Sequence, residues 1–223
     1  MTLGKYTTQT KAKYLKTEPA LNDEELVMVF NKGKKKIVNQ IMQRWEWPYM
    51  RELAKYVTSK GGDILEVGFG MGISAGFIQE SNKIDVHTVI ECHPKMIAHA
   101  KNKFKNAVKK GRLIISEGFW EDQAKKMPDK SFDGILFDSC PLDKEVEFFQ
   151  FFPFFKEAYR LLKDDGIFTY FSDEPHGLSE QHLHELKKAG FKNIKFETCK
   201  VEPPADCIYW KHATITVPIV RKF

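Results

Sequence analysis

A carboxylate among aromatic side chains is the first feature of this sequence that indicates chemistry. Glu46 lies in RWEWPYM, residues 44–50, between Trp45 and Trp47. Placing a carboxylate among rings is costly unless a cation or a set of hydrogen-bond donors meets it. Glu46 therefore either faces water at the surface or marks a position where a positively charged group lies between the rings.

A second carboxylate stands at the end of an apolar run. Asp138 closes ILFD at residues 135–138, which has the composition of a buried strand. In open α/β sheets, ligands bind at the carboxyl ends of the strands. Asp138 is thus placed either to hold a cation and accept a proton, or simply to cap its strand.

A glycine-rich turn, EVGFGMG at residues 66–72, follows the first predicted buried strand. Glycines let a ligand approach the backbone closely, and the start of the next helix offers free N–H groups. Glu91 ends the second strand, where an acid can accept hydrogen bonds from ribose hydroxyls. After the third strand, EGFWED at residues 117–122 offers aromatic rings that can stack on an adenine.

The glycine spacing favours one nucleoside cofactor over another. The spacing is GxGxG, whereas nicotinamide dinucleotides are typically bound by GxGxxG, and Glu66 precedes the turn inside the strand. Residues 1–60 come before the first strand and suit a lid over a cofactor. We therefore predict S-adenosylmethionine as the cofactor. A tight strand–helix turn without a ligand is the alternative interpretation.

These residues need a scaffold of alternating strands and helices. From Gly62 onward, strand and helix patterns alternate, which predicts a mostly parallel seven-stranded sheet with helices on both faces. Before it, residues 22–30 and the stretch from about Lys35 are predicted to be helices of an N-terminal lid, with Asn22 as a helix cap. Pro48 suits the start of the following helix, so Glu46 lies at a break between helices. We expect a single domain, with residues 1–60 as the lid and 61–223 as the Rossmann-like core.

Composition excludes several classes of protein. The 223 residues carry a formal net charge of +5, but 35 basic and 30 acidic residues are interspersed, which does not favour a nucleic-acid partner. The basic run at residues 32–36 is interpreted as a solvated face. No apolar run is long enough to span a membrane, and no metal-ligand spacing occurs. We expect four free thiols, no metal, a cytoplasmic location, and a monomer or homodimer.

The motifs together resemble those of guanidinoacetate N-methyltransferase, a class I S-adenosylmethionine-dependent enzyme. The resemblance is close over residues 40–170 and resumes at VEPPADC, residues 201–207. RWE-PYM, ILEVGFGM, IEC, G-WED, FDGIL-D and PPADC occur in order at similar spacing. It implies the class I methyltransferase fold and N-methylation of a small guanidino compound.

The resemblance also implies roles for individual residues. Glu46 and Asp138 match the two carboxylates that grip the guanidinium group, and we assign proton acceptance to Asp138. A guanidinium is planar, stays protonated in water and matches carboxylates in a bidentate way. The cofactor pocket would include, besides Asp138, the residues Met42, Met50, Glu66, Gly68, Gly70, Met71, Gly72, Ile73, Ser74, Ala75, Gly76, Glu91, Cys92, His93, Phe119 and Trp120.

The sequence departs from the family where the substrate tail is bound. FSDEPHG at residues 171–177 replaces a Thr-Ser pair with Glu174 and Pro175, preceded by Asp173. Two acids repel a carboxylate, so Asp173 and Glu174 are predicted to bind a cationic or zwitterionic tail, as in agmatine or arginine. The alternatives are a nicotinamide-dependent oxidoreductase, a non-catalytic S-adenosylmethionine-binding protein and methylation of a protein arginine.

Overall fold

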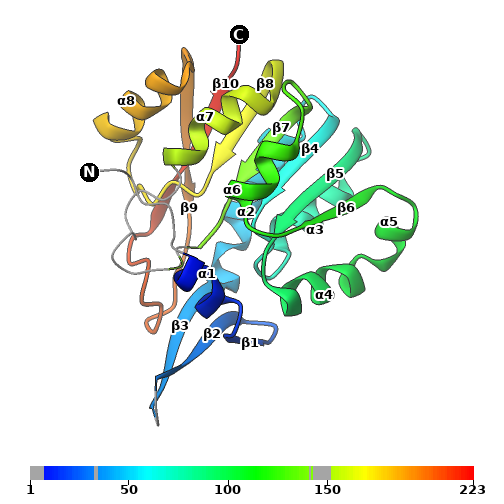
Figure 1. Ribbon diagram of the computed structural model, residues 1–223. Helices are drawn as coiled ribbons and strands as arrows, with labels where there is room; N and C mark the ends of the chain where they lie inside the picture. The colour runs from blue at the N-terminus through cyan, green and yellow to red at the C-terminus, as the bar shows by residue number, and fades with distance from the viewer. Residues whose placement is uncertain (1–7, 33–34, 141, 143–151) are drawn as a thin grey trace.

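The computed structural model describes residues 8–32, 35–140, 142 and 152–223. A seven-stranded sheet forms the centre, and a three-stranded antiparallel sheet lies at one end of it (Figure 1). The large sheet is parallel except that its strand β10 runs antiparallel to both neighbours, which confirms the predicted architecture. In spatial order its strands are β6 (Leu113–Glu117), β5 (Ile84–Glu91), β4 (Gly62–Val67), β7 (Phe132–Phe137), β8 (Leu162–Tyr170), β10 (Thr214–Arg221) and β9 (Asn193–Lys200).

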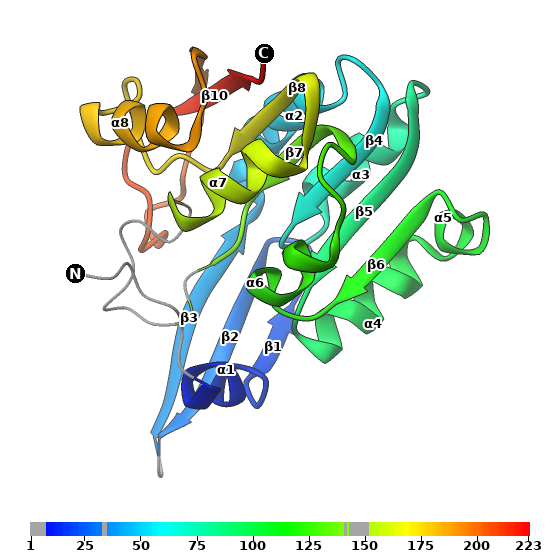
Figure 2. The ribbon, with the colours of Figure 1, turned by 45° about the horizontal axis from the view of Figure 1, so that its top comes forward.

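Helices cover both faces of this sheet (Figures 1 and 2). Strand β4 is buried on both faces, and its apolar residues serve both cores. Ile64 packs into the core on one face, and Leu65 and Val67 pack into the core on the other, because successive strand residues point to opposite sides. The first core includes residues of α2 (Trp47–Val57), α3 (Ile73–Glu80), α4 (Pro94–Lys103) and α5 (Lys105–Lys109), and the second is covered by α6 (Trp120–Gln123), the short helix η2 (Ala124–Lys126), α7 (Phe152–Leu161) and α8 (Glu180–Ala189).

The N-terminal segment, predicted to be a helical lid, consists mainly of strands, so the prediction of helices there is wrong. After helix α1 (Thr8–Tyr14), an antiparallel meander is formed by β1 (Glu18–Leu21), β2 (Glu25–Lys32) and β3 (Lys35–Gln43). Leu26 and Met28 are buried and alternate with β-branched valines, which is the period of a strand. Asn22 does not cap a helix: its side chain accepts hydrogen bonds from the N–H groups of Glu24 and Glu25 in a turn between strands. The β2–β3 hairpin projects from the body of the molecule (Figure 2).

One further boundary differs from the sequence pattern. Residues 207–220 are rich in apolar residues, which predicts a strand over the whole stretch, but the last strand begins at Thr214 because residues 207–213 form a loop. Helix α7 begins at Phe152 with Pro153 in its first turn, where proline is tolerated. In the sequence, the helical pattern of α7 starts earlier, at about residue 144, but residues 144–151 lie outside the described residues, as do residues 33 and 34 of the basic run.

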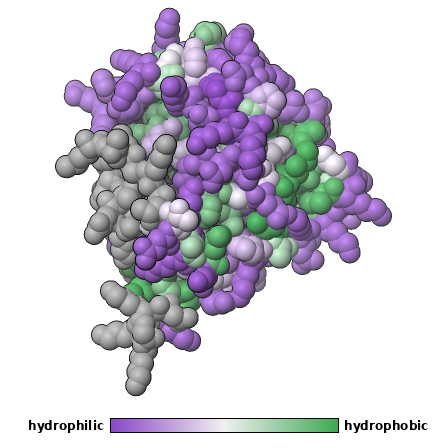
Figure 3. Space-filling model, viewed as in Figure 1, coloured by the Kyte–Doolittle hydropathy of each residue, from purple (hydrophilic) through white to green (hydrophobic). Residues whose placement is uncertain are grey.

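The visible surface is mostly hydrophilic (Figure 3). On the face shown, hydrophobic side chains gather over the β6 edge of the sheet, where the structure leaves Ile114 exposed. Among the described residues, no helix is both long enough and apolar enough to cross a bilayer. The four cysteines are free thiols, as predicted.

Gly68 is the position at which the glycine turn meets strand β7. Its φ is +89°, and a Cβ there would lie 1.9 Å from the Asp138 carbonyl oxygen. We expect Gly68→Ala to lower the free energy of unfolding by at least about 3 kcal/mol, because it adds both left-handed strain and a backbone clash. Gly76→Ala is the matched control, since its Cβ would meet no atom within 4 Å and should be neutral or mildly stabilising. Urea unfolding of both variants measures the difference, and equal stabilities would contradict this account.

Candidate active site

A cavity of about 1020 Å³ lies at the carboxyl ends of the central strands, between them and the small sheet. Strands β4, β5 and β7 contribute the residues at which they end, and β2 and β3 supply an apolar wall. The loop at residues 207–213 closes a further side. Ten of the residues predicted from the sequence line this cavity: Met42, Glu46, Gly68, Gly70, Glu91, Cys92, Phe119, Trp120, Asp138 and Asp173.

Glu46 is held in the wall of this cavity by hydrogen bonds. It ends the short 3-10 helix η1 (Arg44–Glu46), and only 2% of the residue is exposed. The Tyr209 hydroxyl donates to Glu46 Oε1 at 2.5 Å, and the backbone N–H of Gln43 donates to the same oxygen at 3.0 Å. Among the described residues, both hydrogen bonds to this carboxyl group are accepted by Oε1. The second oxygen, Oε2, is therefore available to a ligand in the cavity.

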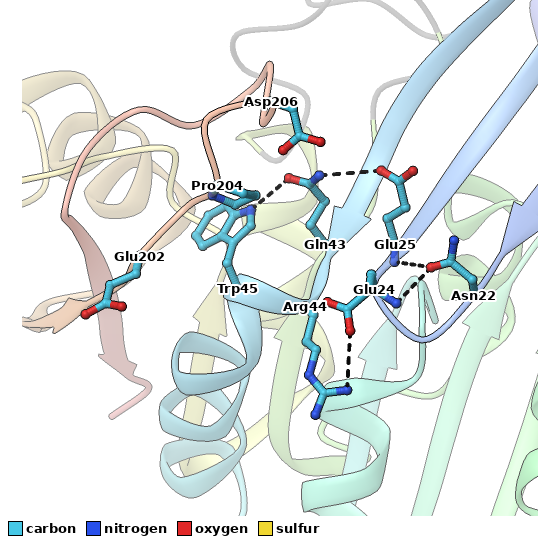
Figure 4. A pocket seen from close by; sticks show the side chains of 9 residues that line it. All are labelled: Asn22, Glu24, Glu25, Gln43, Arg44, Trp45, Glu202, Pro204 and Asp206. Carbon is cyan, nitrogen blue, oxygen red and sulfur yellow. Dashed lines mark hydrogen bonds and ion pairs between the residues drawn. The ribbon is translucent and has the colours of Figure 1, made fainter.

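The turn that carries Glu46 is anchored from outside. A hollow of about 500 Å³ borders this turn and is lined by Gln43, Arg44 and Trp45 of the turn together with the acids Glu24, Glu25, Glu202 and Asp206 (Figure 4). There, the Gln43 side chain accepts from Trp45 Nε1 at 3.2 Å and donates to a Glu25 carboxylate oxygen at 3.4 Å (Figure 4). The Trp45 ring also packs on Tyr209, with centroids 5.8 Å apart. The side chains of Gln43 and Trp45 therefore fix the backbone of this turn, and the Glu46 carboxyl group lines the cavity.

Asp138 lies across the same cavity at the end of β7, and the two acids affect each other's protonation. Burial, followed by the negative charge of Asp138, raises the pKa of Glu46 to about 8. Burial, followed by the charges of Glu66 and Asp173, raises the pKa of Asp138 to about 7. A buried pair of carboxyl groups with raised pKa values needs a cation to ionise fully near neutral pH. The site thus has the charge and protonation behaviour of a receptor for a positively charged group.

The pH dependence of substrate capture follows from these pKa values. A guanidinium stays charged throughout the neutral range, so it binds best when both carboxyl groups have lost their protons. We expect kcat/KM for a guanidino substrate to rise about a hundredfold per pH unit below about pH 7, because two protons must leave, and about tenfold between pH 7 and 8. It should level off above about pH 8. Initial rates at sub-saturating substrate measure this. A flat profile from about pH 6 to 9 would mean that neither carboxyl group titrates in this range.

The neighbouring wall fits a nucleoside cofactor. Gly68, Gly70 and Gly72 all have left-handed φ angles, so the backbone between β4 and α3 is open to a ligand. Glu91 is nearly buried at the end of β5, and its carboxyl group accepts from the N–H groups of Phe69, Cys92 and His93. A fixed, inward-facing carboxyl group beside a glycine turn suits ribose hydroxyls.

The aromatic residues near Glu91 differ in their surroundings. The Phe119 ring lies under the Lys11 ammonium, with Nζ 4.6 Å from the ring centroid. The Trp120 ring packs edge-on against Phe137 and Phe154, at centroid distances of 5.9 and 5.3 Å. Phe119 therefore presents its ring to a cation, whereas much of Trp120 belongs to the core. Stacking of either ring on an adenine stays a prediction.

The other predicted site residues do not line the cavity. His93 caps α4 and joins its ring Nε2 to the Thr17 carbonyl oxygen at 3.2 Å, so it ties the lid to the core. The Glu174 carboxylate points to His182, with 3.6 Å between Oε1 and Nε2. The predicted residues outside the lining are Met50, Glu66, Met71, Gly72, Ile73, Ser74, Ala75, Gly76, His93 and Glu174.

Glu66 is a buried structural acid. It accepts a hydrogen bond from Ser74, and its Oε2 lies 3.0 Å from His87 Nε2. This cluster joins β4, β5 and the first turn of α3 below the glycine turn. Glu66 therefore supports the turn from beneath and raises the pKa of Asp138 through its charge.

Two lining residues, Tyr209 and Trp210, were missed by sequence reasoning. They follow the PPADC motif, but nothing local marks them as site residues, because Tyr209 reaches Glu46 across 163 positions of the chain. Tyr14 was missed as well: its hydroxyl lies 3.8 Å from Cys140 Sγ at the cavity wall. Such contacts depend on the fold and not on sequence spacing.

Solved structures share the fold of this chain. Spermidine synthase from Thermotoga maritima matches with a TM-score of 0.65 and 15% identity, covering 92% of this chain and 72% of that one. A SAM-dependent methyltransferase from Archaeoglobus fulgidus matches with a TM-score of 0.55 and 15% identity, covering 79% and 92%. The fold is that of the class I methyltransferases, as predicted.

Sequence comparison then gives the family. The profile of the guanidinoacetate N-methyltransferase family matches residues 22–223, and the chain belongs to this family. The match confirms the resemblance and favours a methyltransferase over a nicotinamide-dependent oxidoreductase.

The curated relatives are named for methylation of protein arginine and not of guanidinoacetate. Protein arginine N-methyltransferase 2 of Saccharomyces cerevisiae is 32% identical over 168 residues, which is 71% of this chain and 37% of the relative. The protein of the same name from Aspergillus oryzae is 36% identical over 137 residues, which is 60% of this chain and 32% of the relative. The chain therefore spans between about a third and two fifths of the length of these relatives.

Proposed function

We propose that this protein transfers a methyl group from S-adenosylmethionine to a nitrogen of a guanidino group. The observation that carries the proposal is the pair Glu46 and Asp138: two acids with raised pKa values that line one cavity next to a glycine turn. Membership of the family supports the reaction class, and the names of the curated relatives support an arginine-type guanidino group.

The cofactor would be held by the turn at Gly68 and Gly70 and by Glu91, and when bound it supplies an electrophilic methyl group on a sulfonium. Ionised Glu46 and Asp138 together bind and orient the planar guanidinium. Because a protonated nitrogen has no free electron pair, one N–H proton must leave as the nitrogen is methylated, and Asp138 accepts it. The Tyr209 hydroxyl holds Glu46 in the orientation that directs the nitrogen.

The charges around the cavity support arginine or an arginine-like compound as substrate. Asp173 lines the cavity and suits a positively charged tail group. Lys13, Lys211 and His212 also line it and suit an oxygen anion. A zwitterionic tail matches both signs, whereas the predicted contribution of Glu174 is weakened by its contact with His182.

Methyl transfer from labelled S-adenosylmethionine to arginine, agmatine, guanidinoacetate and Nα-acetylarginine amide tests the proposal. We expect at least one of these guanidines to be methylated, with one S-adenosylhomocysteine formed per methyl group transferred. Tight binding of S-adenosylmethionine without turnover of any guanidine would overturn the proposal and favour a non-catalytic cofactor-binding protein.

A further inference from the structure

One buried acid behind the cavity has no role in the mechanism above. Glu66 is fully buried on strand β4 and does not line the cavity. Its Oε1 accepts a hydrogen bond from the Ser74 hydroxyl, and its Oε2 lies 3.0 Å from His87 Nε2, although these two atoms are not aligned for a hydrogen bond. Burying a carboxyl group is costly, so its presence at this position calls for a reason.

The charge of Glu66 is not cancelled by its neighbour His87. The Gln79 side-chain nitrogen lies 3.2 Å from His87 Nδ1. An amide nitrogen can only donate, so Nδ1 accepts and the single ring proton lies on Nε2, toward Glu66. The His87 ring is therefore neutral. Both contacts of the Glu66 carboxyl group are with donor atoms, which favour its ionised form.

The sheet places Glu66 directly behind Asp138. Glu66 pairs in register with Leu136 on the parallel strand β7, and residues paired in this way point to the same face of a sheet. Asp138 follows Leu136 by two residues, so its side chain points to this face as well. Such diagonal neighbours are about 8 Å apart at Cα. Gly68, which contacts Asp138 from β4, has no side chain to separate the two carboxyl groups.

Several titratable groups face Asp138, and Glu66 differs from the other acids in its access to a ligand. Besides Glu66, these groups come from η1, α2 and the two loops that follow β7 and β8: Glu46, Tyr49, Cys140 and Asp173. Glu46 and Asp173 line the cavity, where a bound cation can neutralise them. Glu66 lies behind the wall, so its charge still acts on Asp138 when the site is occupied. After burial, this charge is the largest cause of the raised pKa of Asp138.

We propose that Glu66 is a positioning residue whose negative charge makes Asp138 a stronger acceptor for the proton that leaves the guanidino nitrogen. This inference rests on the proposed function. A guanidinium paired with Asp138 stabilises the charged carboxylate and so weakens it as a base. The fixed charge of Glu66 opposes this effect from the side that the substrate does not reach. The proton therefore moves to Asp138 more readily as the nitrogen is methylated.

Glu66→Gln removes this charge and keeps the shape of the side chain. Asp138 then loses its proton more easily, so the steep part of the kcat/KM profile should move from below about pH 7 to below about pH 6. The rate of methyl transfer in a single turnover at about pH 9 should fall about threefold, because the weaker base takes the proton less readily. A profile at the wild-type pH, or one moved to higher pH, would overturn the inference whatever the rate.

Two further variants separate charge from packing. Glu66→Asp keeps the charge and shortens the side chain, so it should retain the wild-type pH profile even if the protein is less stable. Asp63→Asn is the matched control for charge on the same strand, because Asp63 lies at the other end of β4, pairs with Lys163 and does not line the cavity. It should leave the profile unchanged. A Glu66→Asp profile shifted as far as that of Glu66→Gln would mean that Glu66 acts through packing alone, and it would contradict the inference.

A titration without substrate keeps this inference distinct from the proposed function. The ¹³C signal of the Asp138 carboxyl group, identified by its loss in Asp138→Asn, follows the ionisation of this group directly. We expect its midpoint in the ligand-free protein to lie at lower pH in Glu66→Gln than in the wild type. An unchanged midpoint would overturn the inference. Failure to methylate any guanidine would leave this titration as it is and would overturn the proposed function instead.

If Glu66→Gln does not fold, the wild-type protein decides the same question. The ¹³C signal of the Glu66 carboxyl group should shift in a step as Asp138 ionises at about pH 7, because two nearby charges act on each other. Asp138→Asn should abolish this step. The lack of any such step in the wild type would overturn the inference.

Discussion

Asp138→Asn should lower kcat for guanidine methylation by about three orders of magnitude. The amide has nearly the shape of the carboxylate, but it cannot take the proton that must leave the nitrogen, and it removes one of the two negative charges that hold the guanidinium. The glycine turn does not depend on the Asp138 side chain: its contact with Gly68 is through the Asp138 carbonyl oxygen. We therefore expect the variant to fold and to retain S-adenosylmethionine.

Single-turnover transfer of a labelled methyl group measures this effect, and calorimetric titration with S-adenosylhomocysteine measures cofactor binding. Asp164→Asn is the matched control, because Asp164 pairs with Lys130 in an exposed ion pair away from the cavity. A retained rate above about a tenth of the wild-type value would exclude Asp138 as the proton acceptor, since the loss of a general base costs about 100-fold or more.

Glu46→Gln should act mainly on substrate binding. We expect kcat/KM to fall about 100-fold or more, largely through KM, because the guanidinium loses one of its two charged partners in a buried site. Glu52→Gln provides the matched control on helix α2: Glu52 pairs with Lys55 outside the cavity. A variant with wild-type KM and a reduced kcat would assign Glu46 to the chemical step and not to binding.

The same variant tests the electrostatics without any substrate. The folded state raises the pKa of Glu46 from 4.5 to about 8, so between these pH values the folded protein holds a proton that the unfolded chain has released. Stability therefore falls as pH rises through this window and is constant above it. We expect Glu46→Gln to flatten this decline in urea unfolding of the ligand-free protein. If stability declined with pH as steeply as in the wild type, a group other than Glu46 would cause the decline.

The core could be predicted from sequence because its signals are local. Strand β4 is an apolar run next to glycines, and Asp138 directly follows another such run, so their position at the carboxyl edge follows from the topology of parallel strands. Glu46 also lines the cavity, but its local pattern left open whether it faces water, and the family resemblance assigned it to the site.

The lid and the far side of the cavity could not be predicted in the same way. In residues 22–30 the acids after Asn22 resemble a helix start, and the helix was predicted from them. The alternation of Val27 and Val29 with buried neighbours, which is typical of a strand, was given less weight. Glu174 was assigned to the substrate from its charge alone, whereas the fold turns it toward His182. Tyr209 shows the same limit, because it reaches Glu46 across 163 positions of the chain.

Strand β10 gives the molecule an order of assembly. It is the last strand of this sequence, yet it lies between β8 and β9, which both precede it. During synthesis, β9 therefore has no place on the sheet until residues 214–221 have emerged and inserted beside β8. The loop at residues 207–213 is then drawn against the cavity by the same strand. A nascent chain stopped before residue 214 would contain Glu46, Asp138 and the glycine turn, but it would lack the strand that anchors the loop carrying Tyr209.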